Sequence, residues 1–188
     1  METKHEGVGY PTLMPALNGE FVPSGKVGGK THFFRLMKFI EGVHLDSIDF
    51  YSKPFLRHVG RVLGEMSMLL KDYSGKVLSN FMINSDAKSV RSYMGKGSNA
   101  VFAHFFENYE GMVMPTMDKI PKVVIHGDFH PGNIIVDKES QKIIGIIDFG
   151  CSGMSHPGYD LGTIICHMLG DGKKCQFEDI MEVLMGFC

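Results

Sequence analysis

Three polar residues stand at fixed offsets in the chain: Asp128, Asn133 five residues later, and Asp148 in the string DFG. Phosphoryl transfer passes through a loose transition state, so its catalysis depends mostly on positioning and on neutralising charge. A carboxylate such as Asp128 can orient an acceptor hydroxyl and accept its proton. Mg²⁺ takes oxygen ligands beside phosphates and water, and Asn133 and Asp148 offer an amide and a carboxylate oxygen. The three residues therefore predict a phosphoryl-transfer site.

A strand and a hairpin must position these residues. Residues 123–125 are apolar and predict a strand before the loop that carries the first carboxylate. Residues 133–136 and 142–147 predict two more strands, which a short polar link joins into a hairpin. This hairpin is expected to bring Asn133 and Asp148 together. The same roles and offsets define the H-R-D-x-x-x-x-N and D-F-G elements of protein kinases.

Each of these residues also has a structural explanation when it is taken alone. Asp128 fits a turn, Gly-Asn is an ordinary turn dipeptide at Asn133, and Asp148 fits a loop cap, but their joint spacing favours the kinase interpretation. A second chemistry uses the alternation of His126, Asp128 and His130, which could serve a two-metal hydrolase. That hypothesis leaves Asn133 and the DFG string unexplained. We expect His126 to anchor the loop, and His130 to be structural or exposed rather than a ligand.

Helical periodicity dominates the rest of the chain. Apolar residues three to four apart predict a helix over residues 53–73. Gly60 and Gly64 lie in it four residues apart, and close packing against another helix explains them. Further helices are expected over residues 88–94, 99–112, 159–169 and from 176 onward. The aromatic residues of the helix over 99–112 are expected in the core.

The N-terminal part predicts loops and short strands instead of helices. Residues 7–30 are rich in Gly and Pro, which is typical of loops and strand edges. A short stretch at residues 20–22 and the apolar run over 31–40 are expected to pair as strands.

Composition and charge narrow the class of protein. Of 188 residues, 44% are hydrophobic and 21% are charged, as in ordinary globular proteins. The net charge of −2 disfavours a nucleic-acid partner, which would need a strongly basic face.

Because no apolar run is long enough to span a membrane and the first residues lack a signal-peptide core, we expect a cytoplasmic protein without a membrane partner. Four cysteines without a C-x-x-C pair favour reduced thiols over disulfides or zinc ligands. The oligomeric state is not indicated.

The strings HGDFHPGN and IIDFG resemble the aminoglycoside phosphotransferase and choline kinase family. Residues 33–42 resemble the hinge strand of that family, and residues 156–165 resemble its Asp-Leu-Gly helix start. The resemblance implies an α+β, protein-kinase-like fold with a mostly helical C-terminal lobe that contains the catalytic-loop β-hairpin. It also implies Asp128 as the catalytic base, and Asn133 and Asp148 as ligands of Mg²⁺.

Five further residues take roles from the same resemblance. His126 is expected to brace the catalytic loop, and Asp160 to support it. Met37 is expected at the back of the purine pocket. The carbonyl of Lys38 and the N–H of Ile40 would hydrogen-bond the base of GTP or ATP, the phosphoryl donor.

Within the family, residues 9–20 and the string RLMKFIEG most resemble the hydroxylysine kinases. This implies transfer to the hydroxyl of a small amine or amino acid, with 5-hydroxy-L-lysine as the expected acceptor. Only 32 residues precede Phe33, whereas a small lobe with a glycine-rich loop and a phosphate-binding Lys needs roughly 60–70 at typical element lengths. We therefore expect residues 1–42 to be a remnant of a largely missing N-terminal lobe with its hinge, and residues 43–188 a C-terminally truncated catalytic lobe. A catalytically inactive kinase fragment is the alternative.

Overall fold

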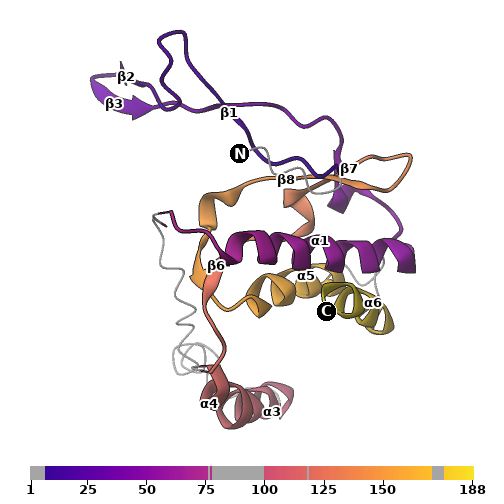
Figure 1. The fold of residues 1–188 in the computed structure, drawn as a ribbon. Coiled ribbons are helices and arrows are strands. Elements are labelled where there is room, and N and C mark those ends of the chain that lie inside the picture. Colours follow the sequence, from indigo (N-terminus) through magenta and orange to yellow (C-terminus); the bar gives the residue numbers. More distant parts are fainter. Residues whose placement is uncertain (1–6, 76, 78–99, 118, 171–175) are drawn as a thin grey trace.

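The computed structural model combines a central helix, α1, with short strands on one side and further helices on the other (Figure 1). It describes residues 7–75, 77, 100–117, 119–170 and 176–188. The described helices are α1 (Lys53–Lys71), α3 (Ala100–Asn108), α4 (Met114–Met117), α5 (Gly158–Gly170) and α6 (Ile180–Phe187). The strands are β1 (Leu13–Met14), β2 (Ser24–Val27), β3 (Lys30–Phe33), β4 (Leu36–Met37), β5 (Val43–His44), β6 (Val123–Ile125), β7 (Ile134–Val136), β8 (Ile143–Ile146) and β9 (Gly153–Ser155).

Helix α1 begins with a side-chain cap and buries one face. The Ser52 hydroxyl accepts a hydrogen bond from the Phe55 N–H at 3.3 Å, and Pro54 occupies the first turn, where its missing N–H costs nothing. The buried face consists of Phe55, Leu56, Val59, Val62, Leu63 and Met66. The predicted helix over residues 53–73 is confirmed and ends two residues earlier than expected.

Helices α1 and α6 pack with their backbones in close approach. A Cβ built at Gly60 would lie 2.0 Å from the Val183 carbonyl oxygen, and one built at Gly186 would lie 2.0 Å from the Arg57 carbonyl oxygen. Arg57 also forms an ion pair with Glu182 of α6 at 2.8 Å. The close packing predicted from Gly60 is therefore confirmed.

The predicted hairpin is present as β7 and β8, which pair antiparallel with Ile134 opposite Ile146. Strand β5 joins the free edge of β7 to make a three-stranded sheet. Strand β6 pairs antiparallel with β9, with Val123 opposite Ser155. The two sheets bring the loop after β6 next to the turn that follows β8, and this arrangement positions the candidate site.

The N-terminal strands differ from the prediction in register. Residues 20–22 are not a strand; β2 and β3 form the hairpin instead, and β1 pairs with β4. Gly28 and Gly29 both have positive φ, +60° and +79°, which is the backbone that a two-residue hairpin turn requires. This turn determines which residues pair. The strand that pairs with β3 is therefore residues 24–27 and not the expected residues 20–22.

The helical stretch predicted over residues 99–112 runs on to Met117. Its middle is a π-helical turn, Tyr109–Val113, between α3 and α4. Of the aromatic stripe expected in the core, Phe106 is buried and Tyr109 is half-buried. The side chains of Phe102 and Phe105, like the whole helix expected over residues 88–94, lie outside the described residues.

The predicted C-terminal helices are confirmed as α5 and as a 3-10 turn (Phe177–Asp179) that leads into α6. The cysteines that the structure describes, Cys151, Cys166 and Cys188, are free thiols. Among the described helices, none combines the length and the apolar character needed to cross a membrane.

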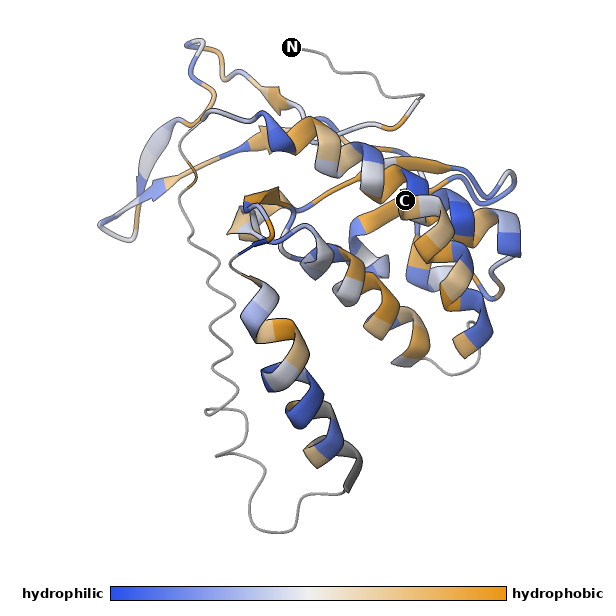
Figure 2. Cartoon of the chain, turned by 60° about the horizontal axis from the view of Figure 1, so that its bottom comes forward, coloured by the Kyte–Doolittle hydropathy of each residue, from blue (hydrophilic) through white to orange (hydrophobic). Residues whose placement is uncertain are grey.

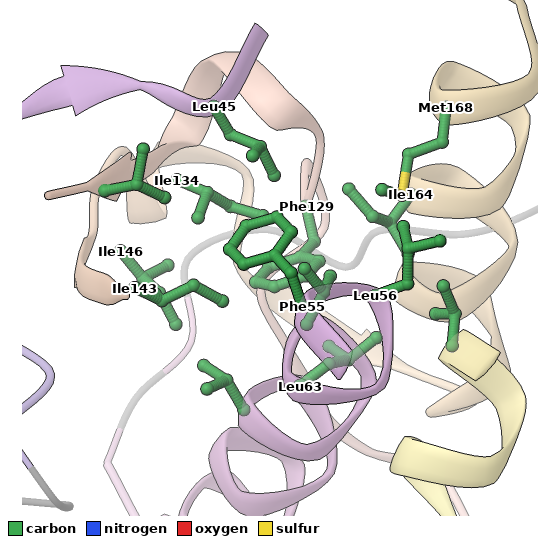
Figure 3. Close-up of a cluster of buried hydrophobic side chains, with 14 of the residues drawn as sticks. Leu45, Phe55, Leu56, Leu63, Phe129, Ile134, Ile143, Ile146, Ile164 and Met168 are labelled. Atoms are coloured by element: carbon green, nitrogen blue, oxygen red, sulfur yellow. The ribbon is translucent and has the colours of Figure 1, made fainter. Parts of the chain in front are cut away.

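The hydrophobic core extends directly under the candidate site. Phe129, from the loop after β6, has no exposed surface and lies among buried side chains of α1, the hairpin and α5 (Figure 3). Its neighbours in this cluster include Leu45, Leu56, Leu63, Ile134, Ile146 and Ile164. Because a buried aromatic ring stabilises a protein by several kcal/mol, about 3–5 on removal, Phe129 anchors the loop that carries the residues on either side of it.

Candidate active site

The loop after β6 can take its path because residue 127 is a glycine. Gly127 has φ +82°, and a Cβ at this position would lie 2.2 Å from the Cys151 carbonyl oxygen. The loop therefore lies directly against the backbone that follows the DFG string. No side chain larger than hydrogen fits between the two segments.

The buried imidazole of His126 joins the two segments that carry the acidic residues. Its Nε2–H donates to the Ile147 carbonyl at 2.9 Å, and its Nδ1 accepts from the Asp128 N–H at 3.2 Å. This pair of bonds is satisfied by the neutral ring with its proton on Nε2. Burial lowers the pKa of His126, mainly because a charged imidazole would lose its hydration. One side chain thus connects Asp128 with the residue before Asp148.

Asp160 holds the same loop from the first turn of α5. Its Oδ2 accepts from the His126 N–H at 2.8 Å and its Oδ1 accepts from the Gly127 N–H at 2.9 Å. The side chain is buried, and burial raises its pKa even though the two N–H donors favour the charged form. The carboxylate therefore holds two successive backbone groups of the loop in place.

Asn133 lies next to Asp128, as the spacing predicts. The Asn133 side-chain nitrogen donates to the backbone carbonyl of Asp128 at 2.9 Å and to the carboxylate oxygen Oδ2 of Asp128 at 3.2 Å. Asn133 is buried and Asp128 is half-buried. Since the amide nitrogen is held by Asp128, the amide oxygen of Asn133 is the atom that can ligate a cation.

Asp148 reaches the same place from the end of the hairpin. The Ile147 N–H donates to the Asn133 carbonyl at 2.9 Å, so Asp148, the next residue, lies beside Asn133. Its backbone is left-handed, with φ 62° and ψ 63°, and its exposed carboxylate accepts from the Gly150 N–H at 3.3 Å. One carboxylate and one amide oxygen fit the chemistry of Mg²⁺, which takes its other ligands from phosphates and water.

The two-metal hydrolase hypothesis needs a larger group of ligands. Within the described ranges, no group of three or more His, Cys, Asp or Glu side chains is arranged to hold a metal ion. Asn133 and Asp148 instead offer one amide and one carboxylate oxygen, a smaller donor set.

Phe149 is held between the loop after β6 and the N-terminal segment. Its ring centroid lies 4.5 Å from that of His126 and 6.0 Å, edge-on, from that of Tyr10. Tyr10 is positioned by Gly9, whose N–H donates to the Ile144 carbonyl at 2.8 Å. Burial raises the pKa of Tyr10, with the nearby carboxylate of Glu65 acting in the same direction.

A cavity of about 740 Å³ opens beside this cluster, between the N-terminal strands, the end of α1 and the DFG turn. Met37 and Asp148 both line it, together with Arg35. Lys38 and Ile40 do not. The Lys38 N–H donates to the Thr12 carbonyl at 2.8 Å, and the Ile40 side chain lies over Gly9 and Gly145. The structure therefore brings Met37 and Asp148 to one cavity and leaves the other two hinge residues beside it.

One residue at the site was not expected there. His130 lies with its Nε2 3.6 Å from Asp128 Oδ2, and its ring stacks on that of His167 with centroids 5.0 Å apart. The signal that could have found it is the alternation of His126, Asp128 and His130 in the sequence.

The chain is similar to known phosphotransferases in sequence pattern and in fold. The model of the phosphotransferase enzyme family matches residues 22–179. Among solved structures, an amicoumacin kinase in complex with AMP-PNP, Ca²⁺ and Ami has a TM-score of 0.67 at 17% identity, over 96% of this chain and 55% of that one. A microcompartment-associated aminopropanol kinase has a TM-score of 0.66 at 16% identity, over 96% of this chain and 58% of that one. The GDP complex of aminoglycoside 2'-phosphotransferase-IIIa has a TM-score of 0.62 at 19% identity, over 96% of this chain and 60% of that one.

No curated protein matches the chain. At these low identities the solved structures show a common α+β, kinase-like fold, and this chain spans less than two thirds of the length of each of the three. The family match covers most of the chain and includes every residue from Asp128 to Asp148. The chain belongs to the phosphotransferase enzyme family.

Proposed function

We propose that this chain is the catalytic part of a kinase that transfers the γ-phosphate of a nucleoside triphosphate to the hydroxyl of a small amine or amino acid. The observation that carries the proposal is that hydrogen bonds hold Asp128, Asn133 and the residue before Asp148 together. Asn133 hydrogen-bonds Asp128, and the buried His126 ties the backbone of Asp128 to that of Ile147. Catalysis of phosphoryl transfer depends on such positioning.

Asp128 is the proposed catalytic base. Its carboxylate accepts the proton of the acceptor hydroxyl while the hydroxyl oxygen forms a bond to the γ-phosphorus. The bond between that phosphorus and the bridging oxygen breaks, and the nucleoside diphosphate leaves. A positioned general base contributes about 10²- to 10⁴-fold to the rate, so loss of this carboxylate should remove most of the turnover.

Asn133 and Asp148 are the proposed holders of Mg²⁺. When bound, the ion would neutralise charge on the β- and γ-phosphates. Met37, the Lys38 carbonyl and the Ile40 N–H are proposed to hold the purine. A solved relative that binds AMP-PNP and Ca²⁺ supports the pairing of a nucleotide with a divalent cation at this fold.

The finer assignments rest on sequence strings and on relatives. We take GTP as donor and 5-hydroxy-L-lysine as acceptor, because residues 9–20 resemble the hydroxylysine kinases. A relative solved with GDP and another named as an aminopropanol kinase are compatible with a guanine nucleotide and an amino-alcohol acceptor. Residues 1–42 would then be strands of the N-terminal lobe with the hinge, and residues 43–188 the catalytic lobe. The free thiols of the described cysteines are compatible with a cytoplasmic enzyme.

An inactive member of the family is the second candidate. Such a protein would bind nucleotide weakly and would not transfer phosphate.

The test is a transfer assay with the purified chain, Mg²⁺, and either GTP or ATP. The acceptors are 5-hydroxy-L-lysine, small amino alcohols, and lysine as the acceptor that lacks the hydroxyl. We expect slow formation of a phosphorylated hydroxylysine and none with lysine. Asp128→Asn should abolish the product and leave nucleotide binding, measured by calorimetry, unchanged. Unchanged turnover in Asp128→Asn would remove this residue from its role, and binding without transfer in the wild type would favour the inactive member.

A further inference from the structure

We propose that His130 is a positioning residue for Asp128, so that the two oxygens of this carboxylate have different roles. The proposal rests on the function proposed above, in which Asp128 is the base. His130 acts through Asp128 and does not itself exchange a proton with the substrate.

The hydrogen bonds of His130 determine which of its nitrogens carries the proton. The residue precedes the 3-10 turn Pro131–Asn133, and its Nδ1 accepts from the Gly132 N–H at 3.1 Å. An imidazole nitrogen that accepts a hydrogen bond carries no proton. The proton of the neutral ring is therefore on Nε2, and Nε2 is the atom that faces Asp128 Oδ2 at 3.6 Å.

The two oxygens of Asp128 are not equivalent. Oδ2 accepts from the Asn133 amide at 3.2 Å and faces the His130 N–H at 3.6 Å. Both donors lie on the same oxygen, so Oδ1 is the oxygen that turns to the acceptor hydroxyl. Hydrogen bonds at a catalytic site are often long before the substrate binds and shorten in the reactive complex. Once this contact shortens to a hydrogen bond, His130 becomes a second restraint on the rotation of the carboxylate beside Asn133.

The His130 ring is held from its own side as well. It stacks on His167 of α5 at a centroid distance of 5.0 Å and an interplanar angle of 27°. The turn that carries it is fixed by His44, whose Nδ1–H donates to the Gly132 carbonyl at 2.6 Å. A small cavity of about 200 Å³, lined partly by Asp46 and His130, lies beside the pair. A ring with this support can hold a fixed direction toward Asp128.

The first test measures the tautomer and does not depend on activity. Nitrogen-15 spectra of the histidine rings are recorded at about pH 8, above the ordinary histidine pKa of about 6.5, and His130 is assigned with a His130→Gln variant. We expect the proton on Nε2. A proton on Nδ1, or rapid averaging between the two nitrogens, would overturn the proposal.

The second test separates positioning from a structural role. His130→Ala should lower kcat about 10- to 100-fold, less than loss of the base itself, at about 10²- to 10⁴-fold, while KM for the nucleotide stays unchanged. His130→Gln keeps an N–H donor and should restore part of kcat. His104→Ala, an exposed histidine of α3, serves as the matched control and should behave as wild type. Thermal unfolding of each variant confirms that it is folded.

Two kinetic results would contradict the role of His130: wild-type kcat in His130→Ala, or equal losses in His130→Ala and His130→Gln. Failure of the proposed function has a different signature, because the wild-type chain would then form no phosphorylated product at all. In that case the tautomer measurement alone decides whether His130 holds its Nε2–H toward Asp128.

Discussion

His126 and Asp160 are two buried ionisable residues that hold the loop after β6 through its backbone. Burial lowers the pKa of the imidazole and raises that of the carboxyl group, because each loses hydration in its charged form. The attraction between them acts in the opposite direction and is the smaller effect for each group. The loop is thus ordered by hydrogen bonds to three N–H groups, those of His126, Gly127 and Asp128.

A pH dependence of stability follows from His126. Its folded-state pKa lies below the ordinary value of about 6.5, so the unfolded chain takes up the proton first as the pH falls. Above the ordinary pKa of about 6.5, His126 makes its full contribution to the free energy of unfolding. This contribution is lost as the pH falls from there through the folded-state pKa. In urea unfolding at a series of pH values, we expect the stability gap between wild type and His126→Gln to shrink on acidification. A constant gap would show that His126 has equal pKa values in both states.

Gly127 provides a second prediction at the residue scale. An alanine there must adopt φ +82° and place its Cβ 2.2 Å from the Cys151 carbonyl oxygen. Left-handed backbone and overpacking together cost about 2–5 kcal/mol, so Gly127→Ala should lower the free energy of unfolding by this amount. Gly111→Ala is the control, because a Cβ at Gly111 meets no atom within 4 Å. Equal stability of the two variants in urea would contradict the close approach of the two loops.

At the scale of elements, the sequence predicts those structures that a short stretch of neighbouring residues determines. Two apolar runs with a polar link were enough to predict the β7–β8 hairpin, and the offsets of Asn133 and Asp148 placed them at its end. The pairing of Gly9 with Gly145 has no such signal, because two distant backbone segments meet there without a motif. The alternation of His126, Asp128 and His130 groups His130 with Asp128 in the sequence, but the direction of its ring depends on the turn at Gly132 and has no sequence signal.

The α1–α6 contact makes a prediction for a whole element. Gly60→Ala would place a Cβ 2.0 Å from the Val183 carbonyl oxygen, and helix backbones can move apart only by losing the contacts along both helices. We expect a loss of about 1–3 kcal/mol in the free energy of unfolding and faster proteolysis of α6. Gly162→Ala in α5, where a Cβ meets no atom within 4 Å, is the matched helical control. If Gly60→Ala is as stable as this control, the helices are not in backbone contact.

At the scale of the molecule, apolar side chains divide into two populations. The side chains of the core around Phe129 (Figure 3) are buried. Hydrophobic residues, orange in Figure 2, also occur along the N-terminal segment, and several of them are exposed to solvent. Phe33 is 73% exposed and Phe39 is 80% exposed. Where exposed apolar side chains form one contiguous patch, they mark a place where a protein associates with another surface.

The last prediction concerns this exposed surface. Burying a phenylalanine side chain stabilises an apolar contact by about 1.5–3 kcal/mol, so the chain should self-associate as its concentration rises. Replacing both Phe33 and Phe39 by Ser should weaken the association constant by at least about a hundredfold, since 1.4 kcal/mol corresponds to about tenfold. Sedimentation velocity over a concentration series measures this, with Met181→Ser, an exposed change on α6, as the control. The double variant should unfold at the same urea concentration as wild type in dilute solution, because both rings already face water in the single chain. A wild-type chain that stays monomeric throughout the series would show that these rings do not drive association.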